Sequence, residues 1–156
     1  MFTFTAKDEN ETSVLAKAIA RSLPDRLTIG LVGTLGAGKT FFVMKVSSFW
    51  NIDPSSVVSP TFTICNEYHG DRKVFHFDFY RIKDEDELLE LGVEETFESN
   101  AISFVEWADR FSDTLPDEML RIEISVNEEE ARIFTLTTQN ATTQAVIDSV
   151  AQKING

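Results

Sequence analysis

Apolar residues follow two patterns along the chain, and the first of them, continuous or alternating apolar residues, predicts β-strands. Continuous apolar runs at 26–32 and 101–107 are typical of strands that are buried on both faces. Other segments alternate between apolar and polar residues, and turn residues such as "HGD" at 69–71 separate them. We expect these segments to form the further strands 2–5, 59–68, 73–81, 119–126 and 132–138. Of these, 59–68 and 73–81 should pair as one hairpin, and 119–126 and 132–138 as another.

The second pattern has the spacing of an amphipathic α-helix. The segment 11–23 places its apolar residues at helical spacing and stops at Pro24. In 84–92, Asp84 is a suitable N-cap with Glu87 three residues later, and Gly92 is a suitable C-terminal stop. The helices that we expect are therefore 11–23, 39–50, 84–92 and 142–154.

Strands that alternate with helices predict an α/β fold. The 156 residues suit one compact domain, 1–156, and no repeat, low-complexity tract or linker divides them. No apolar segment is long enough to cross a bilayer, and "MFTFTAKDEN" lacks the basic start and cleavage site of a signal peptide. We therefore expect a cytoplasmic protein without a membrane partner.

One glycine-rich stretch separates the strand 26–32 from the helix that follows it. Gly33-x-x-x-x-Gly38-Lys39-Thr40 matches the phosphate-binding loop, in the strand–loop–helix context that this loop requires. Its backbone N–H groups and the start of the helix favour a bound anion; the alternative is an ordinary glycine-rich turn. Lys39 would reach the β- and γ-phosphates and the Thr40 hydroxyl would bind Mg²⁺. The polyphosphate-binding residues that we expect in the loop are Gly33, Leu35, Gly36, Ala37, Gly38, Lys39 and Thr40.

Magnesium bound to a nucleotide usually needs a carboxylate near the carboxyl end of a neighbouring strand. Glu106 ends the apolar run "ISFV" and is the first candidate. Asp78 is the second, because alternation in 73–81 places it with His76 on the face opposite three phenylalanines. From the pattern alone, the face that carries His76 and Asp78 reads slightly better as a solvated surface than as a site.

Charge and cysteine content limit the partners and the compartment. The formal net charge is −12, whereas a protein that holds nucleic acid unaided normally presents a basic face. A partner is therefore expected to hold any RNA substrate. The single cysteine, Cys65, excludes an internal disulfide, which fits a reducing cytosol. It reads as a packing residue rather than a nucleophile.

Four motifs in order resemble those of the bacterial TsaE (YjeE) family, the small ATPases of the pathway that makes threonylcarbamoyladenosine next to the anticodon of tRNA. They are "LGAGKT" at 35–40, "SPTFTI" at 59–64, "HFDFYR" at 76–81 and "VEW" at 105–107. The resemblance implies a P-loop NTPase-like three-layer α/β sandwich, with a mainly parallel central sheet, helices on both faces and added antiparallel strands. It also implies ATP as substrate, Mg²⁺ as cofactor, and slow ATPase activity in concert with TsaD and TsaB, which perform the transfer to tRNA.

Roles for single residues follow from the resemblance. Lys39, Asp78 and Glu106 would be catalytic, and Thr40 and Glu106 would hold Mg²⁺. The motifs also imply nucleotide-site roles for Thr61, Trp107 and Arg132: a γ-phosphate or metal sensor, a companion near the nucleotide, and an arginine bordering the nucleotide. Thr34 departs from the family, which often has an acidic or amide residue there.

Two other functions use the same loop. A P-loop small-molecule kinase usually has an arginine-bearing lid, and no arginine-rich insertion is visible. A GTPase-type switch needs a guanine-reading Asn-Lys-x-Asp motif, which the chain lacks, so adenine is the better expectation.

Overall fold

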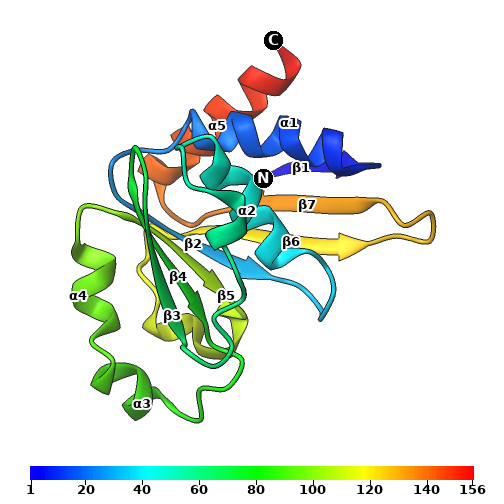
Figure 1. The fold of residues 1–156 in the computed structure, drawn as a ribbon. Coiled ribbons are helices and arrows are strands. Elements are labelled where there is room, and N and C mark those ends of the chain that lie inside the picture. Colours follow the sequence, from blue (N-terminus) through cyan, green and yellow to red (C-terminus); the bar gives the residue numbers. More distant parts are fainter.

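A computed structural model describes residues 1–156, and its centre is one twisted seven-stranded sheet (Figure 1). The strand order is β1-β7-β6-β2-β5-β4-β3. The four central strands, β6, β2, β5 and β4, are parallel, and β3, β7 and β1 add antiparallel pairs at the two sides. The strands are β1 (Phe2–Ala6), β2 (Leu27–Val32), β3 (Cys65–His69), β4 (Lys73–Asp78), β5 (Ile102–Glu106), β6 (Leu120–Val126) and β7 (Arg132–Thr137).

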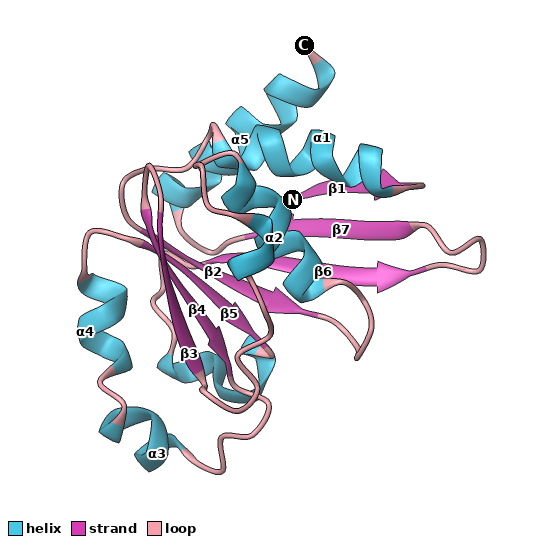
Figure 2. Cartoon of the chain, in the orientation of Figure 1, coloured by secondary structure: helices cyan, strands magenta, loops and turns pink.

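Helices cover both faces of the sheet (Figure 2). Helices α1, α2 and α5 enclose the larger hydrophobic core, whereas α3, α4 and the 3₁₀ segment η2 enclose a smaller one on the opposite face. None of the helices combines the length and the apolar character that a membrane crossing requires. The helices are α1 (Glu9–Ala20), α2 (Lys39–Ser48), α3 (Glu85–Glu90), α4 (Val93–Glu98) and α5 (Ala141–Asn155), with 3₁₀ segments η1 (Pro54–Ser56) and η2 (Ala108–Thr114).

This arrangement confirms the α/β fold with a mainly parallel centre, and both predicted hairpins are present as β3–β4 and β6–β7. The predicted cap is also present: the Asp84 carboxylate accepts the backbone N–H of Glu87 at 3.0 Å, and the Glu87 carboxylate accepts that of Lys83 at 2.9 Å. Gly92 ends α3 in a left-handed conformation with φ 69°. A second short helix, α4, which the pattern did not predict, begins directly after it.

The predicted strand 59–68 is wrong in its first half. Residues 59–64 form a loop, and β3 begins at Cys65. Ile64 takes a left-handed backbone conformation with φ 67°, which no regular strand contains. Upstream of it, the Ser59 and Thr61 hydroxyls bond to the Asp78 carboxylate instead of taking strand positions. Tertiary contacts therefore override the β-propensity of "TFTI".

The carboxyl ends of three neighbouring parallel strands meet at one edge of the sheet. Strand β2 ends at Val32 and leads into the glycine-rich loop, β4 ends at Asp78, and β5 ends at Glu106. Asp78 and Glu106 are directly paired in the register of β4 and β5. This edge is where open α/β sheets gather their ligands.

Candidate functional site

The glycine-rich loop joins β2 to α2 through two residues with left-handed backbone. Gly36 has φ 81° and Gly38 has φ 102°, conformations that cost any other residue steric strain. Gly38 is the N-cap of α2, and no side chain caps that helix. The first N–H groups of α2 therefore have no acceptor within the helix, and they offer a binding site for an anion.

Gly33 is required for a different reason. A Cβ atom at this position would lie 2.7 Å from the carbonyl oxygen of Ile124 on β6. At Gly36 an added Cβ would meet nothing within 4 Å, although φ stays unfavourable. Gly33 is therefore required because a side chain would collide with β6, whereas Gly36 is required for its backbone conformation.

We expect Gly33→Ala to lower the free energy of unfolding by about 1–3 kcal/mol, because the loop must move away from β6. Gly36→Ala is the matched control and should cost about 1 kcal/mol of backbone strain. Urea denaturation of both variants measures the difference. Equal losses in the two would contradict the contact argument at Gly33.

The Lys39 ammonium group lies inside the loop. Its Nζ donates to the carbonyl oxygens of Gly33 at 2.7 Å and Thr34 at 3.0 Å, and it stands 4.2 Å from the centre of the Trp107 ring. The residue is only 5% exposed. Burial lowers the pKa of Lys39, while the charges of Glu106, Asp78 and Asp109 oppose that shift. A buried cation beside backbone N–H groups that have no acceptor within the helix favours a multiply charged anion.

Glu106 is the carboxylate that faces the loop helix. It is 3% exposed, and its Oε2 accepts the Thr40 hydroxyl at 2.7 Å. The same oxygen lies 2.5 Å from Nε2 of His76, which is fully buried. The two predicted magnesium ligands, Thr40 and Glu106, are therefore adjacent.

Asp78 is buried beside Glu106 but contacts a different segment. Its Oδ2 accepts the Thr61 hydroxyl at 3.0 Å and the Ser59 hydroxyl at 3.3 Å, and its Oδ1 accepts the backbone N–H of Tyr80 at 2.9 Å. The solvated face that the alternation favoured for His76 and Asp78 is wrong. Val74, on the same face of β4, belongs to the larger core that α1, α2 and α5 enclose, and both residues are buried on that side.

Trp107 and Arg132 border the loop from opposite sides. Trp107 follows β5 with a left-handed φ of 60°, and its ring packs against that of Tyr80 with centres 4.9 Å apart. The Arg132 Nε donates to the Ala37 carbonyl oxygen at 2.9 Å. A pocket of about 320 Å³ lies beside this arginine, between the start of α1 and the start of α2, with Gly38 and Phe41 in its wall.

The structure thus brings together the predicted residues from all four motifs. Leu35 is the exception, because its side chain is 85% exposed and only its backbone belongs to the loop. Sequence reasoning missed Ser59, Tyr68 and His76 as neighbours of the acidic pair. The shared parity of His76 and Asp78 was a usable signal, but it needed the placement of β4 beside β5. Burial raises the pKa of the Cys65 thiol to about 11, so that it stays protonated at neutral pH, as expected of a packing residue.

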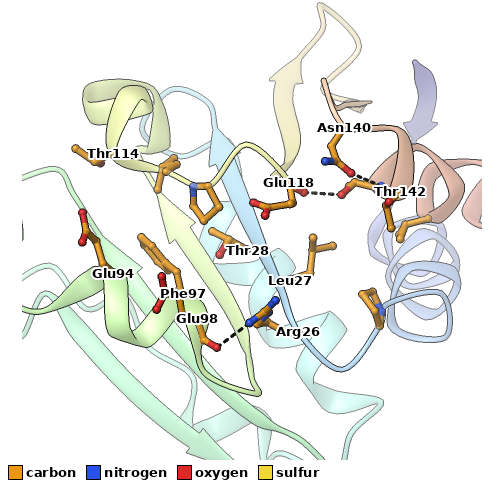
Figure 3. Close-up of a pocket in the computed structure, with 15 residues that line it drawn as sticks. Arg26, Leu27, Thr28, Glu94, Phe97, Glu98, Thr114, Glu118, Asn140 and Thr142 are labelled. Carbon is orange, nitrogen blue, oxygen red and sulfur yellow. Dashed lines mark hydrogen bonds between the residues drawn. The ribbon is translucent and has the colours of Figure 1, made fainter.

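A larger pocket, about 990 Å³, lies elsewhere (Figure 3). It is lined by the start of β2, by α4 and by the start of α5, and none of the loop residues contributes to it. Glu94, Glu98 and Glu118 surround it, and the one arginine, Arg26, donates to the Glu98 carbonyl oxygen (Figure 3). Its acidic lining does not suit a polyphosphate.

Comparisons with known proteins agree with the geometry. The model of the family "Threonylcarbamoyl adenosine biosynthesis protein TsaE" matches residues 6–134. The tRNA threonylcarbamoyladenosine biosynthesis protein TsaE of Aquifex aeolicus is 40% identical over 131 residues, covering 82% of this chain and 92% of that protein. The TsaE protein of Bacillus subtilis is 38% identical over 128 residues, covering 81% of this chain and 79% of that protein.

A solved structure shows the same fold. The crystal structure of YdiB from Bacillus subtilis superposes with a TM-score of 0.82 at 26% sequence identity, and the match covers 99% of this chain and 96% of that one. Fold, motif positions and sequence similarity therefore point in one direction: the chain belongs to the TsaE family of tRNA threonylcarbamoyladenosine biosynthesis proteins.

Proposed function

We propose that the chain is a magnesium-dependent ATPase, slow on its own, that acts with TsaD and TsaB in forming threonylcarbamoyladenosine on tRNA. The observation that carries the proposal is the convergence of the buried Lys39 ammonium group and the Thr40–Glu106 pair on one glycine-rich loop. The loop amides and Lys39 would bind the phosphates. The pocket beside Arg132 would take the nucleoside, because it adjoins the loop at Gly38.

The residues present suit Mg²⁺. Thr40 and Glu106 supply hard oxygen ligands, and Oε1 of the buried Glu106 has no protein hydrogen-bond partner. No group of three or more histidine, cysteine, aspartate or glutamate side chains is arranged to hold a metal. Magnesium does not need one, since it commonly takes one or two protein oxygens and completes its shell with phosphate oxygens and water. When bound, it would offset charge on the transferring phosphoryl group.

The chain's own residues would prepare hydrolysis. Lys39 would supply a counter-charge to the β- and γ-phosphates from inside the loop. Asp78 would hold Thr61 at the edge of the site, where this hydroxyl can sense the γ-phosphate or its metal. The two side chains that bond to Asp78, Ser59 and Thr61, lie on the loop 59–64. A ligand that contacts Thr61 would therefore change the conformation of this loop.

Slow turnover follows from the positions of the arginines. The Arg110 guanidinium donates to the carbonyl oxygens of Phe79 and Tyr80, and Arg132 donates to that of Ala37. Arg81 stacks on the exposed Phe62 ring. Each of these three arginines already contacts another residue of the chain. An arginine that stabilises the transition-state charge would therefore come from a partner protein. A kinase lid is not supported, because the segment 84–98 between β4 and β5 contains no basic residue.

We expect MgADP to bind the isolated chain in a calorimetric titration, and ATP hydrolysis to rise at least about 10-fold when TsaD and TsaB are added together. Hydrolysis is measured as phosphate release from the chain alone, from the partners alone and from the mixture. An isolated chain that hydrolyses ATP as fast as the mixture would refute the partner dependence. A chain that releases no heat with MgADP or MgATP would refute nucleotide binding itself.

A further inference from the structure

Four side chains form one continuous line of hydrogen bonds beneath the loop. The Tyr68 hydroxyl lies 2.9 Å from Nδ1 of His76, and Nε2 of His76 lies 2.5 Å from Oε2 of Glu106. The Thr40 hydroxyl reaches the same Oε2 at 2.7 Å. The residues come from β3, β4, β5 and α2, so that the line crosses three neighbouring strands before it reaches the helix.

The chemistry of the groups fixes the direction of the two hydrogen bonds to Glu106. An ionised carboxylate only accepts hydrogen bonds, so that His76 donates through Nε2–H and Thr40 donates its hydroxyl proton. The other ring nitrogen of His76, Nδ1, is hydrogen-bonded to the Tyr68 hydroxyl. Glu106 is thereby held through one oxygen, Oε2, by two donors on different elements, and Oε1 is left without a protein partner.

We propose that His76 and Tyr68 are positioning residues for the magnesium carboxylate: they fix Glu106 so that its second oxygen is available to the metal. This inference rests on the proposed function. A histidine that orients a ligating carboxylate lowers the cost of ordering that carboxylate when the metal binds. Such outer partners typically change metal affinity by about 10- to 100-fold. Tyr68 acts one step further away, since its hydroxyl bonds to the other ring nitrogen and holds the imidazole ring in place.

Burial explains why this line can be specific. Tyr68 is 6% exposed and His76 is fully buried, so that neither side chain can exchange its partner for bulk water. The Tyr68 hydroxyl also donates to the Val58 carbonyl oxygen at 3.3 Å. His76 has no other hydrogen-bond partner than Tyr68 and Glu106. One of the two side-chain partners of His76 is therefore the carboxylate that would hold the magnesium.

The test measures how much Mg²⁺ strengthens ADP binding, as the ratio of the dissociation constants in excess EDTA and in excess Mg²⁺ by calorimetry. His76→Leu should lower this ratio by about 10-fold or more, with the constant in EDTA unchanged within about 2-fold. His76→Gln should retain most of the ratio, because its amide nitrogen stands in for Nε2 and keeps the bond to Glu106. Tyr68→Phe should lower the ratio by about 3-fold, since it leaves that bond in place but removes its support.

Ser103→Ala is the matched control. Ser103 lies on the same strand as Glu106, is equally buried, and its hydroxyl has no hydrogen-bond partner. This variant should keep the wild-type ratio. Thermal melts of each variant establish that it is folded. Should His76→Leu not fold, the same comparison is made with His76→Gln and Tyr68→Phe.

The inference is overturned if His76→Leu keeps the wild-type ratio, or if it weakens ADP equally with and without Mg²⁺, as a purely structural role would. In the event that His76→Leu is unfolded, an unchanged ratio in Tyr68→Phe overturns it. Failure of the proposed function looks different. A wild-type chain that binds no ADP, or that binds it equally with and without Mg²⁺, removes the nucleotide or the magnesium site itself.

Discussion

Replacing Lys39 with alanine is expected to slow ATP hydrolysis by about 100- to 1,000-fold, measured with TsaD and TsaB present. The Lys39 ammonium group is buried inside the loop and desolvated, which lowers its pKa. A charge that is already desolvated and held by the Gly33 and Thr34 carbonyl oxygens needs little reorganisation to meet a phosphate. The effect should therefore exceed that of removing a surface lysine by orders of magnitude.

Lys45→Ala is the matched control for this variant. Lys45 lies on the same helix, α2, and its ammonium group stands over the Phe41 ring at 5.3 Å. We expect it to leave hydrolysis within about 2-fold of the wild type, because the half-buried Lys45 lies outside the glycine-rich loop and is not held by the loop carbonyl oxygens. Both variants should melt within about 4 °C of the wild type. A Lys39→Ala variant that is folded and still hydrolyses ATP at the wild-type rate would remove the loop from the mechanism.

Local sequence patterns predicted most of the fold because most elements follow from local chemistry. The apolar runs that became β2 and β5 are buried strands, and Asp84 caps α3 as its spacing with Glu87 indicated. The glycine-rich loop was recognisable because its backbone requirements, at Gly36 and Gly38, allow few other residues. Such features are encoded within a few residues of where they act.

The features that escaped prediction depend on neighbours that are distant in the sequence. Alternation correctly placed His76 and Asp78 on one face of a strand, but it could not show that the larger core and the loop 59–64 lie on that face. Likewise, "TFTI" has the composition of a strand, and only the Asp78 carboxylate explains why Thr61 lies in a loop. Both errors concern the same residue, Asp78, which connects three segments of the site.

The turn at Trp107, where η2 begins, also depends on residues that are distant in the sequence. Trp107 directly follows the buried strand β5 with φ 60°, a conformation that ends the strand abruptly. Its ring lies against the Lys39 ammonium group and the Tyr80 ring. Strained residues that persist in this way are commonly held by surrounding structure at functional sites. The site therefore accounts for a turn that propensity alone does not favour.

The two acidic residues of the site, Glu106 and Asp78, are expected to play different roles. After Lys39→Ala, Glu106→Gln should have the second largest effect on ATP hydrolysis. Glutamine keeps the size of the side chain but carries no charge for Mg²⁺, so that the metal's strengthening of ADP binding should be lost and hydrolysis should fall by at least about 100-fold.

Asp78→Asn is the matched comparison, because Asp78 is paired with Glu106 in the strand register and equally buried, yet contacts Thr61 rather than Thr40. It should keep the magnesium effect on ADP binding, since the Thr40–Glu106 pair is untouched. Hydrolysis should fall, because the amide oxygen stays with the Tyr80 N–H and the NH₂ group replaces the oxygen that accepts the Thr61 hydroxyl. Calorimetry with and without Mg²⁺, beside phosphate release with TsaD and TsaB, separates the two outcomes. If both variants lose the magnesium effect to the same degree, the acids share the metal, and Asp78 is a ligand rather than the anchor of the loop 59–64.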